Sequence, residues 1–198
     1  MNIEIKKLEP SITSDYTDFF DNRAFTDNRE WSACYCVFFH WNDEYEKSLR
    51  APGVDVHVHN RNLSAEMIEK GILKGYLAYD GDVAVGWVNA NDKNAYEKLN
   101  PENRPDLWDG YDKSAKTISI TCFAIAPDYR RKGIASALLK RVLEDAAVNG
   151  YDFVEAYVRD IDETIRNYHG PEALYKKAGF EVYKNLGIEK IIRKALKE

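Results

Sequence analysis

Three consecutive cations stand where a run of strand-forming residues gives way to a helical pattern. They are Arg130, Arg131 and Lys132, and Gly133 follows them directly. At the start of a helix the first backbone N–H groups lack partners within the helix, and the helix dipole adds partial positive charge. A glycine at that point leaves room for a phosphate to approach the backbone. The spacing predicts an anion-binding turn, although a basic helix start without any ligand fits the same residues.

Two common nucleotide-binding motifs are excluded at this turn. The Gly-Lys-Ser/Thr of a phosphate-binding P-loop is absent, and so is the first glycine of the dinucleotide-binding motif. The helix that follows begins with Ile134 and Ala135, and the small side chain of Ala135 keeps the turn open. Any anion site here is therefore of another kind.

The elements around the turn predict a mixed α/β chain. Residues 117–126 form a run of strand formers without a charge, and residues 133–148 carry apolar side chains at helical spacing. An Asp80-Gly81 pair between two apolar runs indicates a hairpin. Residues 91–116 are polar and predict a long surface loop beside a site. The other expected strands are 3–8, 76–79, 83–89, 151–158, 180–183 and 188–193, and the other expected helices are 13–25, 64–71 and 171–178.

The segment FAIAPDYRRKGIASALL resembles the core motif of the GNAT superfamily of N-acetyltransferases, which Arg130, Gly133 and Ala135 match. A second signature of that family resembles residues 172–180, where Leu-Tyr and Gly-Phe stand at the right spacing. The resemblance implies an α/β (α+β) fold with a mixed, mostly antiparallel central sheet, splayed strands and helices on both sides. It implies one domain over 1–198, with 75–185 as the acetyl-CoA-binding core and 1–74 on the substrate side.

The resemblance also implies site residues and a reaction. An amine would attack the thioester of acetyl-CoA directly, and backbone N–H near Ile125 would hold the oxyanion. Tyr175 matches the family's general acid, although the chain has thirteen tyrosines and a helical tyrosine usually packs. Relatives often carry an Asn seven residues before that tyrosine; position 168 is Tyr here, and Asn167 is adjacent. The residues expected at the cofactor are Phe123, Ala124, Ile125, Arg130, Arg131, Lys132, Gly133, Ile134, Ala135 and Asn167.

The general base has several candidates. Residues 117–126 contain no carboxylate, so Glu155 on the next strand, Asp160 beyond it and His169 remain, together with a water relay. Glu155 is the residue we predict beside Tyr175 in the catalytic set.

The segment 31–41 concentrates aromatic, thiol and imidazole groups. With His57 and His59 it contains enough ligands for a metal, but Cys34 and Cys36 form no CxxC pair, so we expect no metal site. The alternation over 54–59 places three polar side chains on one face of any strand. The segment fits either a packed aromatic cluster or a wall that holds a cationic amine by cation–π contact. The residues expected in that wall are Trp31, Tyr35, Trp87 and Trp108.

Composition sets the outer limits of function. The net charge of −5 argues against a nucleic-acid partner, and no apolar run is long enough for a membrane span. Three cysteines and a start without an apolar segment favour a reducing compartment, so we expect a cytoplasmic protein. Residues 1–110 hold 12 basic against 20 acidic residues, which favours a cationic substrate.

Three classes of function remain open. The first is an acetyl-CoA-dependent N-acetyltransferase that acts on a primary amine of a small molecule or peptide. The second is a catalytically silent CoA-binding or sensor domain on the same fold, and the third is a metal-binding interaction protein built on the cysteines and histidines. The strands at 180–183 and 188–193 could pair between subunits to form a homodimer.

Overall fold

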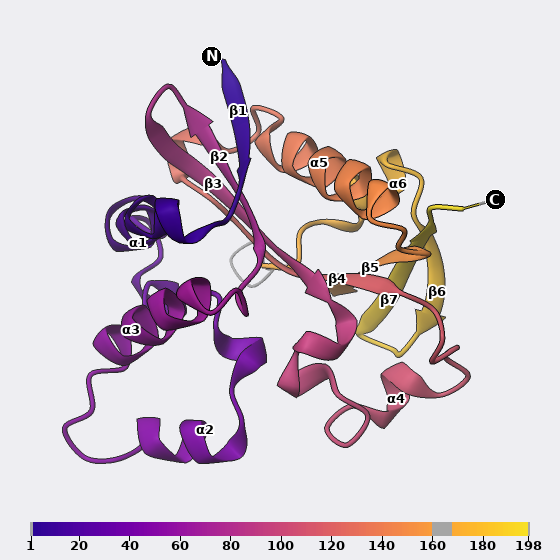
Figure 1. The fold of residues 1–198 in the computed structure, drawn as a ribbon, viewed down its shortest axis with the longest axis horizontal. Helices are drawn as coiled ribbons and strands as arrows, with labels where there is room; N and C mark the ends of the chain where they lie inside the picture. Colours follow the sequence, from indigo (N-terminus) through magenta and orange to yellow (C-terminus); the bar gives the residue numbers. More distant parts are fainter. Residues whose placement is uncertain (1, 160–167, 198) are drawn as a thin grey trace.

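A seven-stranded sheet runs through the molecule in the order β1-β2-β3-β4-β5-β7-β6 (Figure 1). The structure is a computed structural model that describes residues 2–159 and 168–197. Neighbouring strands are antiparallel except β4 and β5, which are parallel. The strands are β1 Ile3–Lys7, β2 Gly75–Asp80, β3 Val83–Asp92, β4 Thr117–Ile125, β5 Phe153–Arg159, β6 Glu181–Asn185 and β7 Glu189–Ala195.

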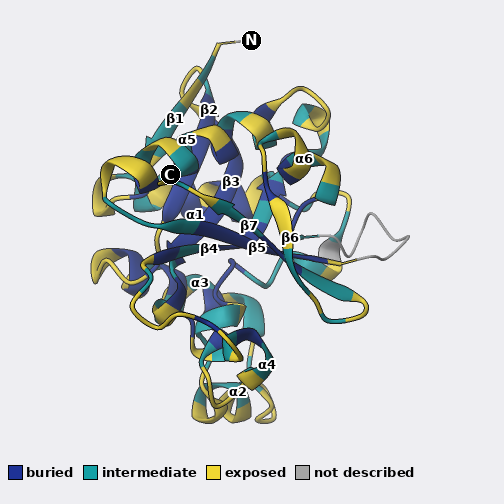
Figure 2. Ribbon diagram, turned by 90° about the vertical axis from the view of Figure 1, so that its right-hand side faces the viewer, coloured by how far each residue is buried: buried dark blue, intermediate teal, exposed yellow. Residues whose placement is uncertain are grey.

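Helices cover both faces of the sheet (Figure 1). One face packs on aromatic side chains such as Phe19 and Phe20 of α1, and the other packs on Leu138 and Val142 of α5. The inner strands β2, β3, β4 and β5 are largely buried (Figure 2). The helices are α1 Thr13–Asn22, α2 Asp43–Leu49, α3 Val56–Glu69, α4 Pro105–Trp108, α5 Ile134–Val148 and α6 Glu172–Lys177. This architecture confirms the predicted fold class.

The sheet opens between its two parallel strands. β4 and β5 pair only over Thr117–Ile120 and Phe153–Ala156. Beyond that point the register of β4 against β3 shifts, because Asn89 faces Cys122 while Ala90 faces Ile120, which leaves Thr121 as an extra residue. A bulge of this kind bends a strand and increases its twist. Among the described residues, no strand pairs with the second half of β4 on its β5 side.

Most predicted elements match the structure, and the exceptions have local causes. The predicted helix start at Ser64 is wrong, because α3 begins at Val56. The Asp55 carboxylate caps it by accepting the N–H groups of His57 and Val58 at 2.9 and 3.2 Å. Residues 56–59 are thus helical, and their alternation does not mark a strand.

Two other expectations need correction. The polar segment 91–116 contains α4 and places Leu99 and Leu107 in a small buried cluster, so it is more than a surface loop. Of the two C-terminal strands, β7 lies inside the sheet between β5 and β6. Only β6 lies at that edge and could pair with another subunit.

Candidate functional site

The second half of β4 has an edge that no strand of the described residues pairs with. Ala126 N–H donates to the carbonyl of Val85 on β3 at 3.0 Å, so the alternate residues Phe123 and Ile125 turn their backbone groups toward the gap. Phe123 N–H donates to the carbonyl of Tyr168 at 2.7 Å. Such an edge can pair with an extended, amide-containing ligand in the manner of an added strand.

The turn after β4 has the backbone of an anion cradle. Arg131 and Gly133 both adopt left-handed φ values, 61° and 85°, and α5 begins directly afterwards at Ile134. Residues of this kind turn successive N–H groups toward one side, and the helix dipole adds to their field. A Cβ atom placed on Gly133 would meet nothing within 4 Å, so the space above the turn is open. The side chains of Arg131 and Lys132 are exposed around it.

Arg130 links the turn to the end of β4 and to the N-terminal region. Its Nε donates to the carbonyl of Ile125 at 3.1 Å, and its Nη2 donates to Asp27 Oδ1 at 3.0 Å. The hydrogen bonds from Arg130 hold the pKa of Asp27 below its ordinary value. The sequence carried no signal for Asp27, because the two residues are 103 positions apart.

Tyr175 lies on α6 beside the β4 edge. Its ring centroid is 6.2 Å from that of Phe123 and 5.2 Å from that of Phe180. The side chain is fully buried, and its hydroxyl donates to the carbonyl of His169 at 2.6 Å. Burial raises the pKa of the phenol well above 10, so the hydroxyl keeps its proton.

His169 occupies the same region without access to solvent. Its ring packs at 4.3 Å from Tyr168 and 5.8 Å from Phe39, and only 1% of the residue is exposed. Burial lowers the pKa of His169 to about 3. The imidazole is therefore neutral at ordinary pH and a weak proton acceptor.

Glu155 is held in a buried ion-pair network. Its carboxylate accepts from Lys93 Nζ at 3.0 Å and from Arg193 Nε at 2.8 Å, and its side chain has no exposed surface. Lys93 also lies 3.9 Å from the ring centroid of Tyr111. Both carboxylate oxygens already accept hydrogen bonds from cations, so Glu155 is poorly placed to act as the general base that the sequence predicts. The sequence could not show this, because the partner lysine lies 62 positions away.

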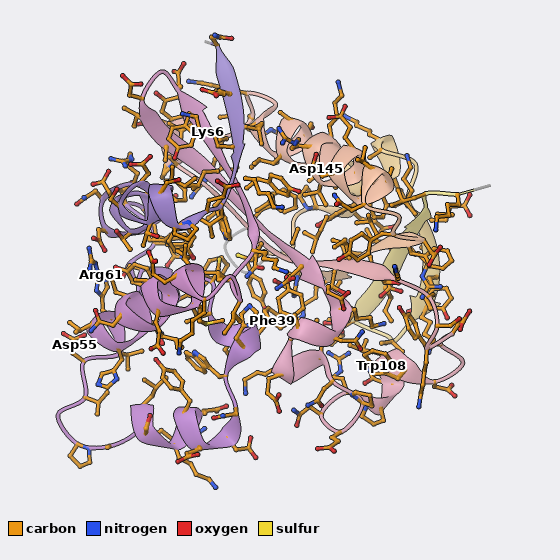
Figure 3. The ribbon with its side chains drawn as sticks, in the orientation of Figure 1. Lys6, Phe39, Asp55, Arg61, Trp108 and Asp145 are labelled. Carbon is orange, nitrogen blue, oxygen red and sulfur yellow. The ribbon has the colours of Figure 1, made fainter. Side chains whose placement is uncertain are left out.

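The four aromatic residues expected in a substrate wall do not converge. Trp31 is half-buried and packs edge-on against Tyr168 at 5.6 Å, next to the second half of β4. Trp87 is fully buried in the core against Tyr16. Trp108 donates its indole N–H to the carbonyl of Leu99 beside α4, on the far side of the molecule from α3 (Figure 3).

Tyr35, the fourth residue, packs in the core beside α1 and α3. It is fully buried, and its hydroxyl donates to the Asp21 carboxylate of α1 and lies 3.0 Å from His57 Nε2 of α3. Its phenol therefore joins two helices of the N-terminal region. Desolvation and the Asp21 carboxylate raise the pKa of Tyr35.

Some sequence predictions fall outside what can be placed. Asn167 and Asp160 lie outside the described residues. Within residues 2–159 and 168–197, no group of three or more His, Cys, Asp or Glu side chains is arranged to hold a metal ion. Within the same ranges, no helix is long and apolar enough to cross a membrane.

The chain belongs to the acetyltransferase (GNAT) family, whose model matches residues 7–180. No curated protein matches the sequence significantly. Similar solved structures cover nearly the whole chain at low identity. They include the PaiA N-acetyltransferase of Thermoplasma acidophilum in complex with coenzyme A (17% identity, TM-score 0.54, covering 98% of this chain and 99% of that one).

Two further structures show the same fold. The yncA structure from Salmonella typhimurium, solved with its cofactor acetyl-CoA, has 14% identity and a TM-score of 0.55 and covers 99% of this chain and 95% of its own. The ribosomal-protein-S18-alanine N-acetyltransferase of Escherichia coli has 14% identity and a TM-score of 0.51, covering 100% and 96%. At these identities the likeness concerns the fold.

Proposed function

We propose that this protein is an acetyl-CoA-dependent N-acetyltransferase that moves an acetyl group directly to a primary amine of a small molecule or peptide. The observation that carries the proposal is the pairing of an open β4 edge with the left-handed turn at Arg131 and Gly133. The edge suits an amide-containing arm, and the turn suits a pyrophosphate. The turn directly follows the β4 edge along the chain, and both lie within the residues that the family model matches.

Acetyl-CoA fits these residues. The backbone of Phe123 and Ile125 on β4, with Ala124 between them, would pair with its pantetheine arm. The N–H groups from Arg131 to Ala135 would hold its pyrophosphate. Two structures of similar fold contain coenzyme A or acetyl-CoA. When bound, acetyl-CoA supplies an activated thioester carbonyl. The Tyr168 carbonyl now paired with Phe123 N–H would have to leave that donor free for the arm.

Tyr175 is the residue we propose as the general acid. Its ring packs against Phe123 of the β4 edge, and its hydroxyl remains protonated because burial raises the pKa. To give its proton to a leaving thiolate, the hydroxyl must turn away from the His169 carbonyl. A positioned proton donor of this kind contributes roughly 100-fold or more to a rate.

We propose that water carries away the proton of the attacking amine. Among the described residues, the two sequence candidates are poorly suited to that role. Glu155 is committed to Lys93 and Arg193, and His169 has a pKa of about 3. A water relay needs no titrating side chain at the point of attack.

The substrate side is assigned to residues 1–74, where Trp31 contacts Tyr168 next to β4. The E. coli structure named above belongs to an enzyme that acts on an alanine of a ribosomal protein, which supports keeping peptide amines among the proposed substrates. The acidic N-terminal half favours a cationic amine.

Calorimetric titration with CoA and acetyl-CoA tests the proposal first. Micromolar binding of both, followed by CoA release with at least one member of an amine panel, is the expected result. Binding without release with any amine would favour the catalytically silent alternative. Absence of binding would contradict the proposed function.

A further inference from the structure

The thiols of Cys36 and Cys122 are in direct contact inside the protein. Their sulfur atoms lie 3.0 Å apart, and the two residues are 86 positions apart in the chain. Both are free cysteines and both are buried, with exposures of 3% and 7%. The sequence gives no sign of this contact, because Cys34 and Cys36 are too close for an ordinary bridge and Cys122 is far from both along the chain.

The backbone around Cys36 is held in an unusual conformation that creates this contact. Tyr35 and Cys36 have φ values of 43° and 48°, in the left-handed region that non-glycine residues rarely adopt. Two buried hydrogen bonds stabilise the turn. The Tyr16 hydroxyl donates to the Tyr35 carbonyl at 2.6 Å, and Asn89 Nδ2 donates to the Cys36 carbonyl at 2.9 Å.

The Asn89 hydrogen bond connects this turn to the paired strands β3 and β4. Asn89 of β3 is the register partner of Cys122 on β4, immediately beside the bulge at Thr121. Phe123, whose N–H faces the gap between β4 and β5, follows Cys122 directly. Cys36 is thus anchored against the residue that precedes the proposed pantetheine-binding edge.

We propose that Cys36 and Cys122 form an oxidation site that closes to a disulfide, with hydrogen peroxide as the oxidant. Their sulfur atoms need to approach by only about 1 Å to reach disulfide bonding distance. The two thiols are already in contact in the folded protein, so closure needs no unfolding. The bond would tie the N-terminal region to β4.

The two thiols have different parts in the reaction. Cys36 Sγ–H donates its hydrogen bond to Cys122 Sγ, and Cys122 is the more exposed of the two. Cys122 loses its proton and, as thiolate, attacks one peroxide oxygen; the O–O bond breaks, leaving a sulfenic acid on Cys122 and hydroxide, which takes up the released proton to give one water. The Cys36 sulfur then attacks the sulfenic sulfur, the S–S bond forms, and the hydroxyl leaves with the Cys36 proton as a second water.

Cys34 provides the internal comparison. Burial raises the pKa of the Cys34 thiol to about 12, and its sulfur has no such hydrogen bond to Cys122 among the described contacts. Burial and the bond to Cys122 raise the pKa of Cys36 as well, so its thiol must give up its proton as it attacks, and the second step is also slow. Because buried thiols react slowly, closure is expected over minutes to hours with millimolar peroxide.

Thiol mapping of the intact protein tests the site. Reduced protein is treated with peroxide, denatured with an alkylating reagent and digested with trypsin. We expect the number of alkylated cysteines to fall from three to one, with a dithiothreitol-sensitive cross-link between the tryptic peptides 30–47 and 117–130. The oxidised protein should also melt several degrees higher, because the bond closes a long loop.

The variants separate the possible bridges. Cys34→Ser should keep the cross-link and the higher melting temperature, whereas Cys36→Ser and Cys122→Ser should both lose them. Three alkylated cysteines after peroxide, a Cys34–Cys36 bridge or a disulfide between two chains would overturn the proposal. Mapping the one alkylated cysteine of the wild type to Cys34, by fragmentation of the cross-linked peptides, decides the matter even if a serine variant fails to fold. It needs no acetyl donor, so it is independent of the proposed function.

Discussion

The hydroxyl of Tyr175 donates to the carbonyl of His169 across 2.6 Å, and both residues are excluded from solvent. The hydrogen bond joins α6 to the turn that precedes it, next to the open edge of β4. Burial keeps the phenol protonated, so the group enters the reaction as a donor. Its orientation toward a carbonyl means that catalysis requires a local change of hydrogen-bond partner.

Tyr175→Phe should lower turnover by about 100-fold while the Kd for acetyl-CoA changes by less than about threefold, because the phenol is proposed to act on the leaving thiolate. Steady-state kinetics and calorimetry measure the two quantities. Tyr76→Phe is the matched control: its hydroxyl donates to Asp145, away from β4's open edge, and should leave turnover unchanged. Full activity of Tyr175→Phe would place the general acid elsewhere.

Gly133→Val should weaken CoA binding at least about tenfold without unfolding the protein. Gly133 has φ of 85° and open space above it, so the valine side chain strains the backbone and fills the position proposed for the pyrophosphate. Gly150→Val is the control, since Gly150 follows the other end of α5 with φ of 75° and open space. Both variants should lose about 1–2 kcal/mol of stability, but only the first should bind CoA more weakly. Equal affinities would remove the pyrophosphate from this turn.

Much of the fold could be predicted because its signals are local. The uncharged run at β4, the Asp80-Gly81 turn and the amphipathic pattern of α5 each specify structure over fewer than twenty residues. The turn at Gly133 also has a local signal, because a glycine just before a helical pattern indicates a tight turn that needs a left-handed φ.

The parts that could not be predicted depend on pairs distant in sequence. Lys93 neutralises Glu155 and Asp27 binds Arg130, yet neither partner carries a spacing signal. The aromatic residues show the same limit, because composition cannot tell a buried tryptophan such as Trp87 from one beside a site such as Trp31. Tertiary packing alone decides which of them contacts the open strand edge.

Glu155→Gln should destabilise the protein by about 3–5 kcal/mol, because it leaves the Lys93 ammonium buried without its counter-charge. Urea unfolding measures the loss. Adding Lys93→Met should restore part of the stability, although Arg193 then still faces an amide. In the folded fraction at low temperature, kcat should stay within about threefold of wild type, since the carboxylate is proposed to be structural. A fall of about 100-fold in kcat with unchanged stability would instead identify Glu155 as the base.

The stability of the protein should rise with pH between about 3 and 6.5, in part through His169. In the unfolded chain this imidazole takes up a proton near its ordinary pKa of 6.5, whereas in the fold burial lowers the pKa to about 3. Between those values the unfolded state binds more protons, so acidification favours unfolding by up to about 1.4 kcal/mol per pH unit. His40 adds a contribution of the same sign, because burial lowers its pKa to about 4.

His169→Gln should therefore reduce the slope of unfolding free energy against pH, measured by urea titration from pH 4 to 6, by about 1 kcal/mol per unit. His40→Gln should flatten the slope independently, and a slope that neither variant changes would mean that the two imidazoles are not buried as neutral groups.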